Sequence, residues 1–233
     1  MYKSIIYSTL LFTLLLFASS FATTLVEVKG DVRVRQGLDE SWQNAAAGME
    51  LQDIDTILCL EGRAVLQLDD GQRFTLGSQS ILDIGDLKTV TRQQLFLYLM
   101  SLKIEQLPDR PQGTPVRLGK VSIVHGTKPT SESADDSFDD RIEQELNGAK
   151  ALYANELYAN AIIKWHKIRK RYPQQGSCGE IDSRIALSFE QLKETGRAID
   201  AWQRVQEQTA ECETPQAQQL ARTAEQHLHD LMP

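Results

Sequence analysis

Hydrophobic residues follow two different periods along this chain, and the change of period divides it into two halves. From Thr24 to about Ile84, apolar and polar residues alternate in short runs that turn residues separate. Alternation of this kind is typical of strands with one buried face. From Asp140 onward, the apolar residues recur every three or four positions, which indicates amphipathic helices. The sequence therefore predicts a multidomain protein, all-β in its N-terminal part and all-α in its C-terminal part.

The first strand region is built around Gly30. Val26 and Val28 precede this glycine, Val32 and Val34 follow it, and all four valines have the same parity. Side chains of equal parity point to one face of a strand. We therefore expect the valines to share a face, either in one strand kinked at Gly30 or in two strands joined there by a tight turn.

A hairpin is predicted within residues 63–77, RAVLQLDDGQRFTLG. A two-residue loop would place apolar residues opposite polar ones. A three-residue loop, 69–71, instead places Leu66 opposite Phe74 and gathers the apolar side chains on one face. Such loops commonly end in a left-handed residue, and glycine suits that conformation, so Gly71 is a structural turn residue. The acidic pair before it lacks the further oxygen ligands of a calcium loop.

The rest of the N-terminal half predicts one helix and one more alternating segment. Residues 92–107 carry leucines at roughly helical spacing, and residues 115–126 return to alternation. We therefore assign residues 23–126 to a β-rich domain. Residues 127–139 are polar, acidic and poor in apolar side chains, so they are expected to form a linker that lets the two halves move independently.

Residues 140–233 repeat themselves at a shift of 37 positions. Ala161 and Trp165 recur as Ala198 and Trp202, and each unit reads as a pair of helices. We take these four residues as the core of the repeat. A last helix, which begins with Thr214 as N-cap, is expected to cap the array.

The helical part resembles the tetratricopeptide family. Its helix pairs carry a small residue where the helices cross and a proline after the second helix; Ala161, Ala198 and Pro173 occupy such positions here. The second copy has Ala210 in place of the proline, and the period exceeds the usual 34 residues by three. The resemblance implies an α-α superhelical domain whose groove binds a peptide or helix of another protein.

Residues of about 25–85 are similar to the FecR domain, a periplasmic module named after the ferric-dicitrate regulator. The similarity rests on an ordered run of features, and Cys59 and its neighbours depart from the family pattern after the Asp-Thr step. These features are Val28-Lys29-Gly30-Asp31-Val32-Arg33-Val34, Trp42, Gly48 and Leu51, Asp55-Thr56, and the hairpin from Ala64 to Gly71. The resemblance implies a periplasmic all-β fold, and a cell-wall glycan is a further candidate ligand of this domain.

Residues 1–22 have the layout of a secretory signal peptide. Lys3 precedes an apolar run that ends in small residues, with cleavage expected after Ala22. An uncleaved membrane anchor is the alternative. Cleavage removes one lysine and no acid, which takes the formal net charge from -7 to -8. An acidic protein of the periplasm or the exterior is a poor candidate for binding nucleic acid or, without its N-terminal helix, a membrane.

The cysteines predict one disulfide. Cys178 precedes the first helix of the second repeat, and Cys212 follows the second helix. Because the helices of a pair run antiparallel, these two corners meet at the same end of the unit. Cys59 is then left as a free thiol in a strand, and the competing pairing joins it to one of the helical cysteines.

Candidate chemistry is sparse in this sequence. It has no nucleophile elbow, zinc-protease motif or phosphate-binding loop, and we expect no enzyme activity and no cofactor. Trp42, in polar surroundings, is either a lid over the β core or a contact for a partner. Lys164, Lys167, Lys170 and Arg171 form the basic face of a helix, which is either solvated or meets an acidic partner or the chain's own linker.

These features favour an exported, non-enzymatic scaffold protein of the bacterial envelope that binds another envelope protein through its helical repeats. Two alternatives stay open at this point. One is a signal-sensing regulator held at the membrane by an uncleaved N-terminal helix. The other is an envelope hydrolase whose catalytic residues are scattered along the chain.

Overall fold

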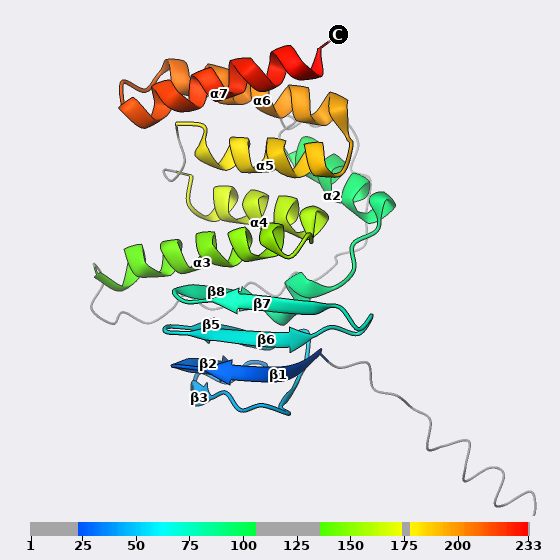
Figure 1. Cartoon of the computed structure of the whole chain (residues 1–233), viewed down its shortest axis with the longest axis vertical. Helices are drawn as coiled ribbons and strands as arrows, with labels where there is room; N and C mark the ends of the chain where they lie inside the picture. The colour runs from blue at the N-terminus through cyan, green and yellow to red at the C-terminus, as the bar shows by residue number, and fades with distance from the viewer. Residues whose placement is uncertain (1–22, 106–135, 174–177, 233) are drawn as a thin grey trace, which may run out of the picture.

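A computed structural model describes residues 23–105, 136–173 and 178–232 of the chain. Residues 1–22 and 115–126, for which a signal peptide and an alternating segment are predicted, lie outside the described residues. Two antiparallel four-stranded sheets are followed by a helical region, α2 to α7 (Figure 1). The elements are β1 (Thr23–Lys29), β2 (Val32–Arg35), β3 (Gln43–Asn44), β4 (Glu50–Leu51), β5 (Thr56–Cys59), β6 (Arg63–Gln67), β7 (Arg73–Gly77), β8 (Ser80–Asp83), the short 3-10 helix η2 (Ile84–Leu87), α2 (Arg92–Glu105), α3 (Asp136–Ala154), α4 (Tyr158–Arg171), α5 (Glu180–Gln191), α6 (Thr195–Ala210) and α7 (Pro215–Leu231).

The chain passes repeatedly from one sheet into the other. The first sheet has the order β4-β1-β6-β7 and the second has the order β3-β2-β5-β8. In each of the successive pairs β1–β2, β5–β6 and β7–β8, the chain leaves one sheet and enters the other. β1 pairs with β6 in one sheet, and β2 pairs with β5 in the other. The segments β1–β2 and β5–β6 therefore bend side by side from one sheet into the other.

The bend between β1 and β2 contacts the bend between β5 and β6 at a pair of glycines. Gly30 and Gly62 have φ of +84° and +85°. A side chain at Gly30 would collide with the carbonyl of Glu61, and one at Gly62 would collide with the carbonyl of Lys29. Only glycine permits both the backbone angle and this close approach. Gly30 therefore joins two strands that belong to different sheets.

The hairpin has the three-residue loop that parity predicts. Leu66 lies opposite Phe74, and the backbone N–H of Leu68 donates to the carbonyl of Gln72 at 2.9 Å. Gly71 is left-handed, with φ of +83°. The side chain of Asp70 accepts a hydrogen bond from the backbone N–H of Gln72 at 2.9 Å, so it has a structural role in the turn.

The four valines do not share one face, contrary to the parity of the sequence. Val26 is 38% exposed, whereas Leu25 beside it is buried together with Val32 and Val34. The cause is a shift of register in the β1–β6 ladder between Leu25 and Glu27. Beyond such an irregularity, the side chains point to the opposite face of the sheet from the one that simple alternation predicts. The pattern of apolar and polar residues does not reveal where the irregularity lies.

Helix α3 joins the sheets to the other helices by packing against the edge strands β7 and β8 (Figure 1). Gly148 brings the helix against the backbone of Ile81 in β8. At the C-terminal end of the helix, the side-chain amide of Asn155 accepts from the N–H of Thr75 and donates to its carbonyl, at 2.9 and 3.0 Å. This amide pairs with the edge of β7 as a further strand would, which protects that edge.

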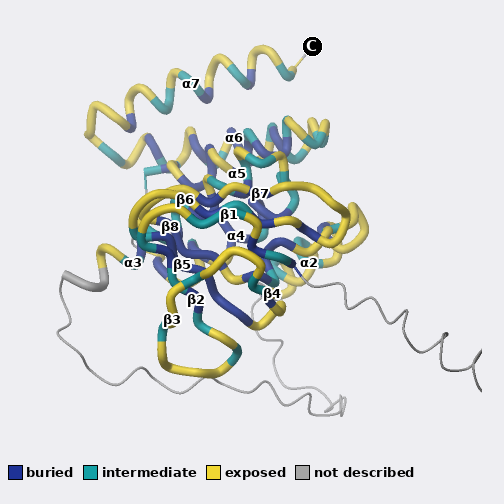
Figure 2. Tube along the Cα trace, turned by 60° about the horizontal axis from the view of Figure 1, so that its bottom comes forward, coloured by how far each residue is buried: buried dark blue, intermediate teal, exposed yellow. Residues whose placement is uncertain are grey.

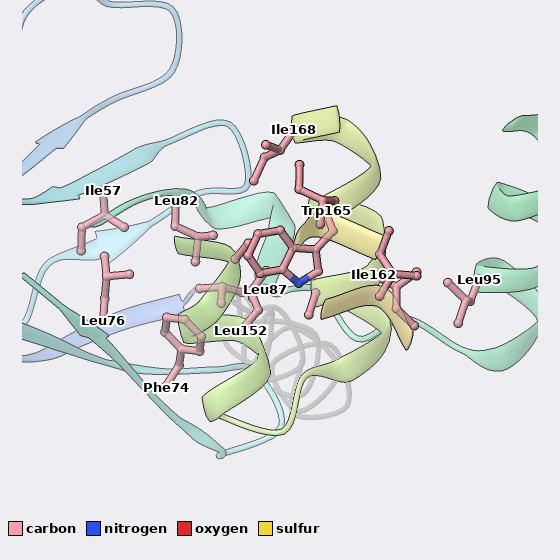
Figure 3. Close-up of a cluster of buried hydrophobic side chains, with 14 of the residues drawn as sticks. Ile57, Phe74, Leu76, Leu82, Leu87, Leu95, Leu152, Ile162, Trp165 and Ile168 are labelled. Atoms are coloured by element: carbon pink, nitrogen blue, oxygen red, sulfur yellow. The ribbon is translucent and has the colours of Figure 1, made fainter. Parts of the chain in front are cut away.

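Because α3 begins at Asp136, residues 136–139 belong to a helix and not to a linker, and residues 127–135 lie outside the described residues. A single hydrophobic cluster also runs from the sheets into the helices. Leu82 of β8 and Leu152 of α3 belong to it, as do Trp165 of α4 and Leu95 of α2 (Figure 3). This shared core contradicts the expectation that the two halves move independently.

The helices α4 to α7 follow α3 as a stack (Figure 1). A disulfide joins Cys178 to Cys212, whose α-carbons are 5.8 Å apart, and Cys59 is a buried free thiol. The last helix starts as expected, with the side chain of Thr214 accepting from the N–H of Ala217 at 3.2 Å. Buried positions alternate along α7 with exposed ones (Figure 2).

Candidate binding cleft

The predicted repeat core is buried in the structure. Ala161, Trp165, Ala198 and Trp202 are each at most 1% exposed. Trp202 also donates from its indole N–H to Glu190 and stacks on His227 of α7, with ring centres 4.5 Å apart. These tryptophans therefore hold the helices together and are not accessible to a partner.

The basic face of α4 is solvated only in part. Its residues 167, 170 and 171 are exposed, but Lys164 is buried, and carboxylates of this chain pair with several of the cations. Lys164 is 4% exposed and lies 2.8 Å from a carboxylate oxygen of Asp86 in η2. Lys167 binds the other oxygen of Asp86 at 2.7 Å. Arg171 pairs with Glu145 of α3 at 2.6 Å. Lys164, Lys167 and Arg171 thus form ion pairs within the molecule, and the side chain of Lys170 lies at the surface.

The cluster around Asp86 fixes η2 against α4. The side-chain amide of Asn160 donates to the carbonyls of Asp86 and Lys88, each at 2.7 Å. Burial alone would raise the pKa of Asp86, but the charges of Lys164 and Lys167 outweigh it and hold that pKa below its usual value. The cluster is an internal contact between the β and α regions, and it leaves no open site.

Trp42 lies just before β3 and is half-buried. The guanidinium of Arg35 stacks over its ring, 5.4 Å from the centre. A shallow hollow on the same domain is lined by Gln36, Gln52 and Ile54 among others. Asp55 also borders this hollow. Each of its carboxylate oxygens accepts a hydrogen bond from a backbone N–H group, so the side chain has a structural role there.

An open cleft lies between α2 and the helices α4, α5 and α6. Its volume is about 230 Å³. Leu99 and Leu102 of α2 and Phe189 of α5 supply apolar surface. The polar lining consists of Lys103 of α2, His166 and Arg169 of α4, and Arg197, Asp200 and Arg204 of α6. The cleft therefore combines an apolar wall with an excess of cationic side chains.

A buried carboxylate orders the floor of this cleft. Asp182 of α5 is 1% exposed and accepts two hydrogen bonds from Nη1 of Arg169, at 2.8 and 2.9 Å. It also accepts from Nε of Arg204 at 3.0 Å and from Gln208 at 3.1 Å. Burial would raise the pKa of Asp182, but the two arginines hold it below its usual value, so the group is anionic at neutral pH.

His166 belongs to the same network. Its exposed fraction is 8%, and its Nδ1 lies 2.9 Å from Nη2 of Arg169. Because a guanidinium can only donate, Nδ1 accepts and the ring proton of the neutral form is on Nε2. Burial and the neighbouring Arg169 lower the pKa of His166 to about 3. The imidazole is therefore uncharged at neutral pH and orients Arg169.

A second group of charges attaches α2 to the helical stack. Glu194, which precedes α6, binds Arg92 of α2 at 3.0 Å and Arg197 of α6 at 3.3 Å. The guanidinium of Arg197 also lies over the ring of Phe96, 5.7 Å from its centre. Leu95 of α2 is buried at the end of the core, on the side of Ile162 (Figure 3). The helix is thus held at one end, and the cleft opens beside its later residues.

The sequence predicted α2 but not what it packs against. One signal was available: Arg197 and Arg204 stand at the 37-residue shift from Asn160 and Lys167. The first pair lines the cleft, and the second binds η2. The same face of the second helix in both units therefore contacts elements that follow the β region, and its polar residues mark that face.

No family model matches this chain, and neither the curated proteins nor the solved structures contain a match to it. Within the described ranges, no group of three or more histidine, cysteine or acidic side chains is arranged to hold a metal ion. None of the helices in the same ranges has the length and apolar character needed to cross a bilayer.

Proposed function

We propose that this chain is an exported, non-enzymatic scaffold protein of the bacterial envelope, which binds a segment of another envelope protein. In this proposal, the β region is FecR-like and the helices α3 to α7 are a short tetratricopeptide-like array. The layout of residues 1–22 and the FecR-like residues support a place in the periplasm or outside the cell. Binding of a cell-wall glycan at the β region stays a prediction.

The cleft between α2 and α4 to α6 is the observation that carries the proposal. It is open, it is bordered by apolar side chains, and its charged groups come from three different helices. A short peptide segment can place one or two side chains in a space of this size. The basic face of α4, by contrast, is engaged with Asp86 and Glu145, so it does not support binding.

Site-specific photo-crosslinking tests the proposal. A photoreactive phenylalanine analogue replaces Leu102 in the cleft, and the same analogue replaces exposed Gln226 on α7 as a matched control. We expect cells that export the protein to yield a discrete cross-linked envelope protein at position 102 and not at position 226. That protein, once purified, should bind the chain in calorimetry, and binding should weaken when Leu99 is replaced by Asp. Equal cross-linking at the two positions, or none at position 102, contradicts the proposal.

A further inference from the structure

We infer that the cleft selects an acidic peptide segment, in which a carboxylate stands beside an apolar side chain, and that Arg204 and Lys103 bind this carboxylate. The inference rests on the proposed function, because it specifies the chemistry of the bound segment. It follows from three properties of the cleft: the free donors, the balance of charge and the apolar wall.

Arg204 is oriented and has unused donors. Its Nε is held by Asp182, and its two terminal nitrogens have no hydrogen-bond partner within the part of the chain that the structure describes. Arg169, by contrast, already uses its terminal nitrogens on Asp182 and His166. Across the cleft, Lys103 has no ion-pair partner among the described residues. A guanidinium held at Nε presents its remaining N–H groups in the fork geometry that suits a carboxylate.

The balance of charge favours an anion. Asp182 serves two arginines, Arg169 and Arg204, and Glu194 likewise serves Arg92 and Arg197. The Asp182 group thus keeps a positive charge at the cleft, to which Lys103 adds another. The surplus charge of the Glu194 group belongs to Arg92, which lies outside the lining. Asp200 is the opposing carboxylate in the lining. This cationic cleft lies in a chain whose formal net charge is -7. Its field therefore attracts an acidic segment locally, against the net charge of the molecule.

The apolar wall of the cleft indicates that the ligand carries an apolar group beside its anionic group. Leu99 and Leu102 of α2 and Phe189 of α5 border the same space as the cations. A free inorganic anion would leave this surface in water, whereas an apolar side chain next to the carboxylate would cover it. Lys103 of α2 and Arg204 of α6 line the same space from different helices. A peptide side chain that enters this space can contact both, which favours a peptide segment over an anionic membrane.

The experiment presents the whole mature protein with three immobilised octapeptide libraries. Their central residue is Glu, Gln or Lys, and the other positions are random. Fluorescein-labelled copies of the best Glu peptide and of its Gln counterpart are then titrated, with fluorescence anisotropy as the readout. We expect the Glu library to be enriched, with a Leu, Ile or Phe next to the Glu. The Gln counterpart should bind about tenfold more weakly, because an ion pair is replaced by a hydrogen bond to an uncharged amide.

Variants of the cleft test the assignment of residues. Arg204→Gln should weaken binding of the Glu peptide about tenfold and reduce its advantage over the Gln peptide to the part that Lys103 provides, whereas Asp200→Asn should strengthen binding of the Glu peptide several-fold by removing a like charge. Arg222→Gln on exposed α7 is the matched control and should leave affinity unchanged. Asp182→Asn should lower the preference for Glu by releasing the two arginines. If the variant at buried Asp182 does not fold, Arg204→Gln still tests the assignment, because Arg204 is at the half-exposed end of the network.

The outcomes separate this inference from the proposed function. Equal recovery of the three libraries, enrichment of the Lys library, or an unchanged Glu preference in Arg204→Gln overturns the inference. If cross-linking at position 102 still yields a specific protein in that case, the proposed function stands alone. Phosphatidylglycerol vesicles are titrated in parallel, and binding to them that Arg204→Gln abolishes would assign the cleft to a lipid and overturn the peptide inference.

Discussion

Two buried carboxylates determine how the helices are arranged. Asp86 binds Lys164 and Lys167, and Asp182 binds Arg169 and Arg204. Desolvation of a buried ion pair offsets much of its Coulomb energy, whereas the loss of one partner leaves an uncompensated charge. These carboxylates therefore contribute more to fixing the geometry than to net stability. The first orients η2 on α4, and the second holds the arginines of the cleft in place.

His166 gives a prediction about pH. Its pKa is lowered from 6.5 to about 3 in the folded protein, so between these values the unfolded chain binds more protons. The free energy of unfolding should therefore fall as the pH is lowered through this window. From pH 7.5 to pH 5, the loss due to this group is about 2 kcal/mol. Urea unfolding of the native protein and of His166→Asn, which keeps an acceptor for Arg169, measures the difference.

The control for this experiment is Gln219→Asn, since Gln219 is exposed on α7 and its side chain carries no titratable group. That variant should show the same pH dependence as the native protein. Asp86 and Asp182 have lowered pKa values as well, and their contribution is lost only at more acidic pH, below the ordinary range of a carboxyl group. A slope between pH 7.5 and 5 that His166→Asn leaves unaltered would show that this imidazole is not buried as a neutral group.

At the scale of elements, α3 is the adapter between the sheets and the helical stack. It covers β8 and β7, the edge strands of the two sheets, and its opposite side packs on α4. Gly148 permits the close approach to β8, since a β-carbon there would collide with the carbonyl oxygen of Ile81. Glycine is a poor helix former, so its presence within α3 reflects this contact.

Gly148→Ala therefore has two opposing effects. The helix propensity of alanine favours the folded state by about 1 kcal/mol, whereas the collision with the backbone of Ile81 disfavours it by about 1 to 3 kcal/mol or more. We expect net destabilisation, seen as a lower melting temperature. Gly196→Ala in α6 is the matched control. Nothing lies within 4 Å of a β-carbon at Gly196, so alanine there should raise the melting temperature. A stabilised Gly148→Ala variant would contradict the tight contact between α3 and β8.

Local patterns predicted much of this arrangement, and distant contacts account for what they missed. The alternation of residues 63–77 was sufficient for the hairpin register, because both strands and the loop lie in one short stretch. The periodicity of α4 does not reveal that Lys164 is buried, because its partner Asp86 is 78 positions away in the sequence. Likewise, residues 92–107 predict a helix, but nothing in their spacing names Arg169 or Arg204 as neighbours across the cleft.

At the scale of the molecule, the β region and the helices form one continuous structure. The hydrophobic cluster includes Leu66 and Phe74 in the sheets, Leu152 in α3, and Trp202 and Leu228 in the last helices. Figure 2 shows the buried positions in the middle of the molecule and the exposed ones around it. Since α3 covers one end of the sheets and α7 ends the stack, the cleft beside α2 is an opening in the side of this continuous structure.

This continuity predicts that both regions unfold in one cooperative transition. Leu82 in β8 is buried, and one of its methyl groups lies near the position of Gly148 in α3. Leu82→Ala should therefore lower the free energy of global unfolding by about 2 to 5 kcal/mol. In native-state hydrogen exchange read by mass spectrometry, the slowest amides of β6 and of α6 should lose protection by equal amounts. Leu228→Ala, in the last helix, tests the same coupling from the other end and should also affect both segments, reaching β6 through the shared core. Loss of protection in β6 alone after Leu82→Ala would mean that the helices unfold as a separate unit, and that the contact of α3 with β8 does not couple the two regions.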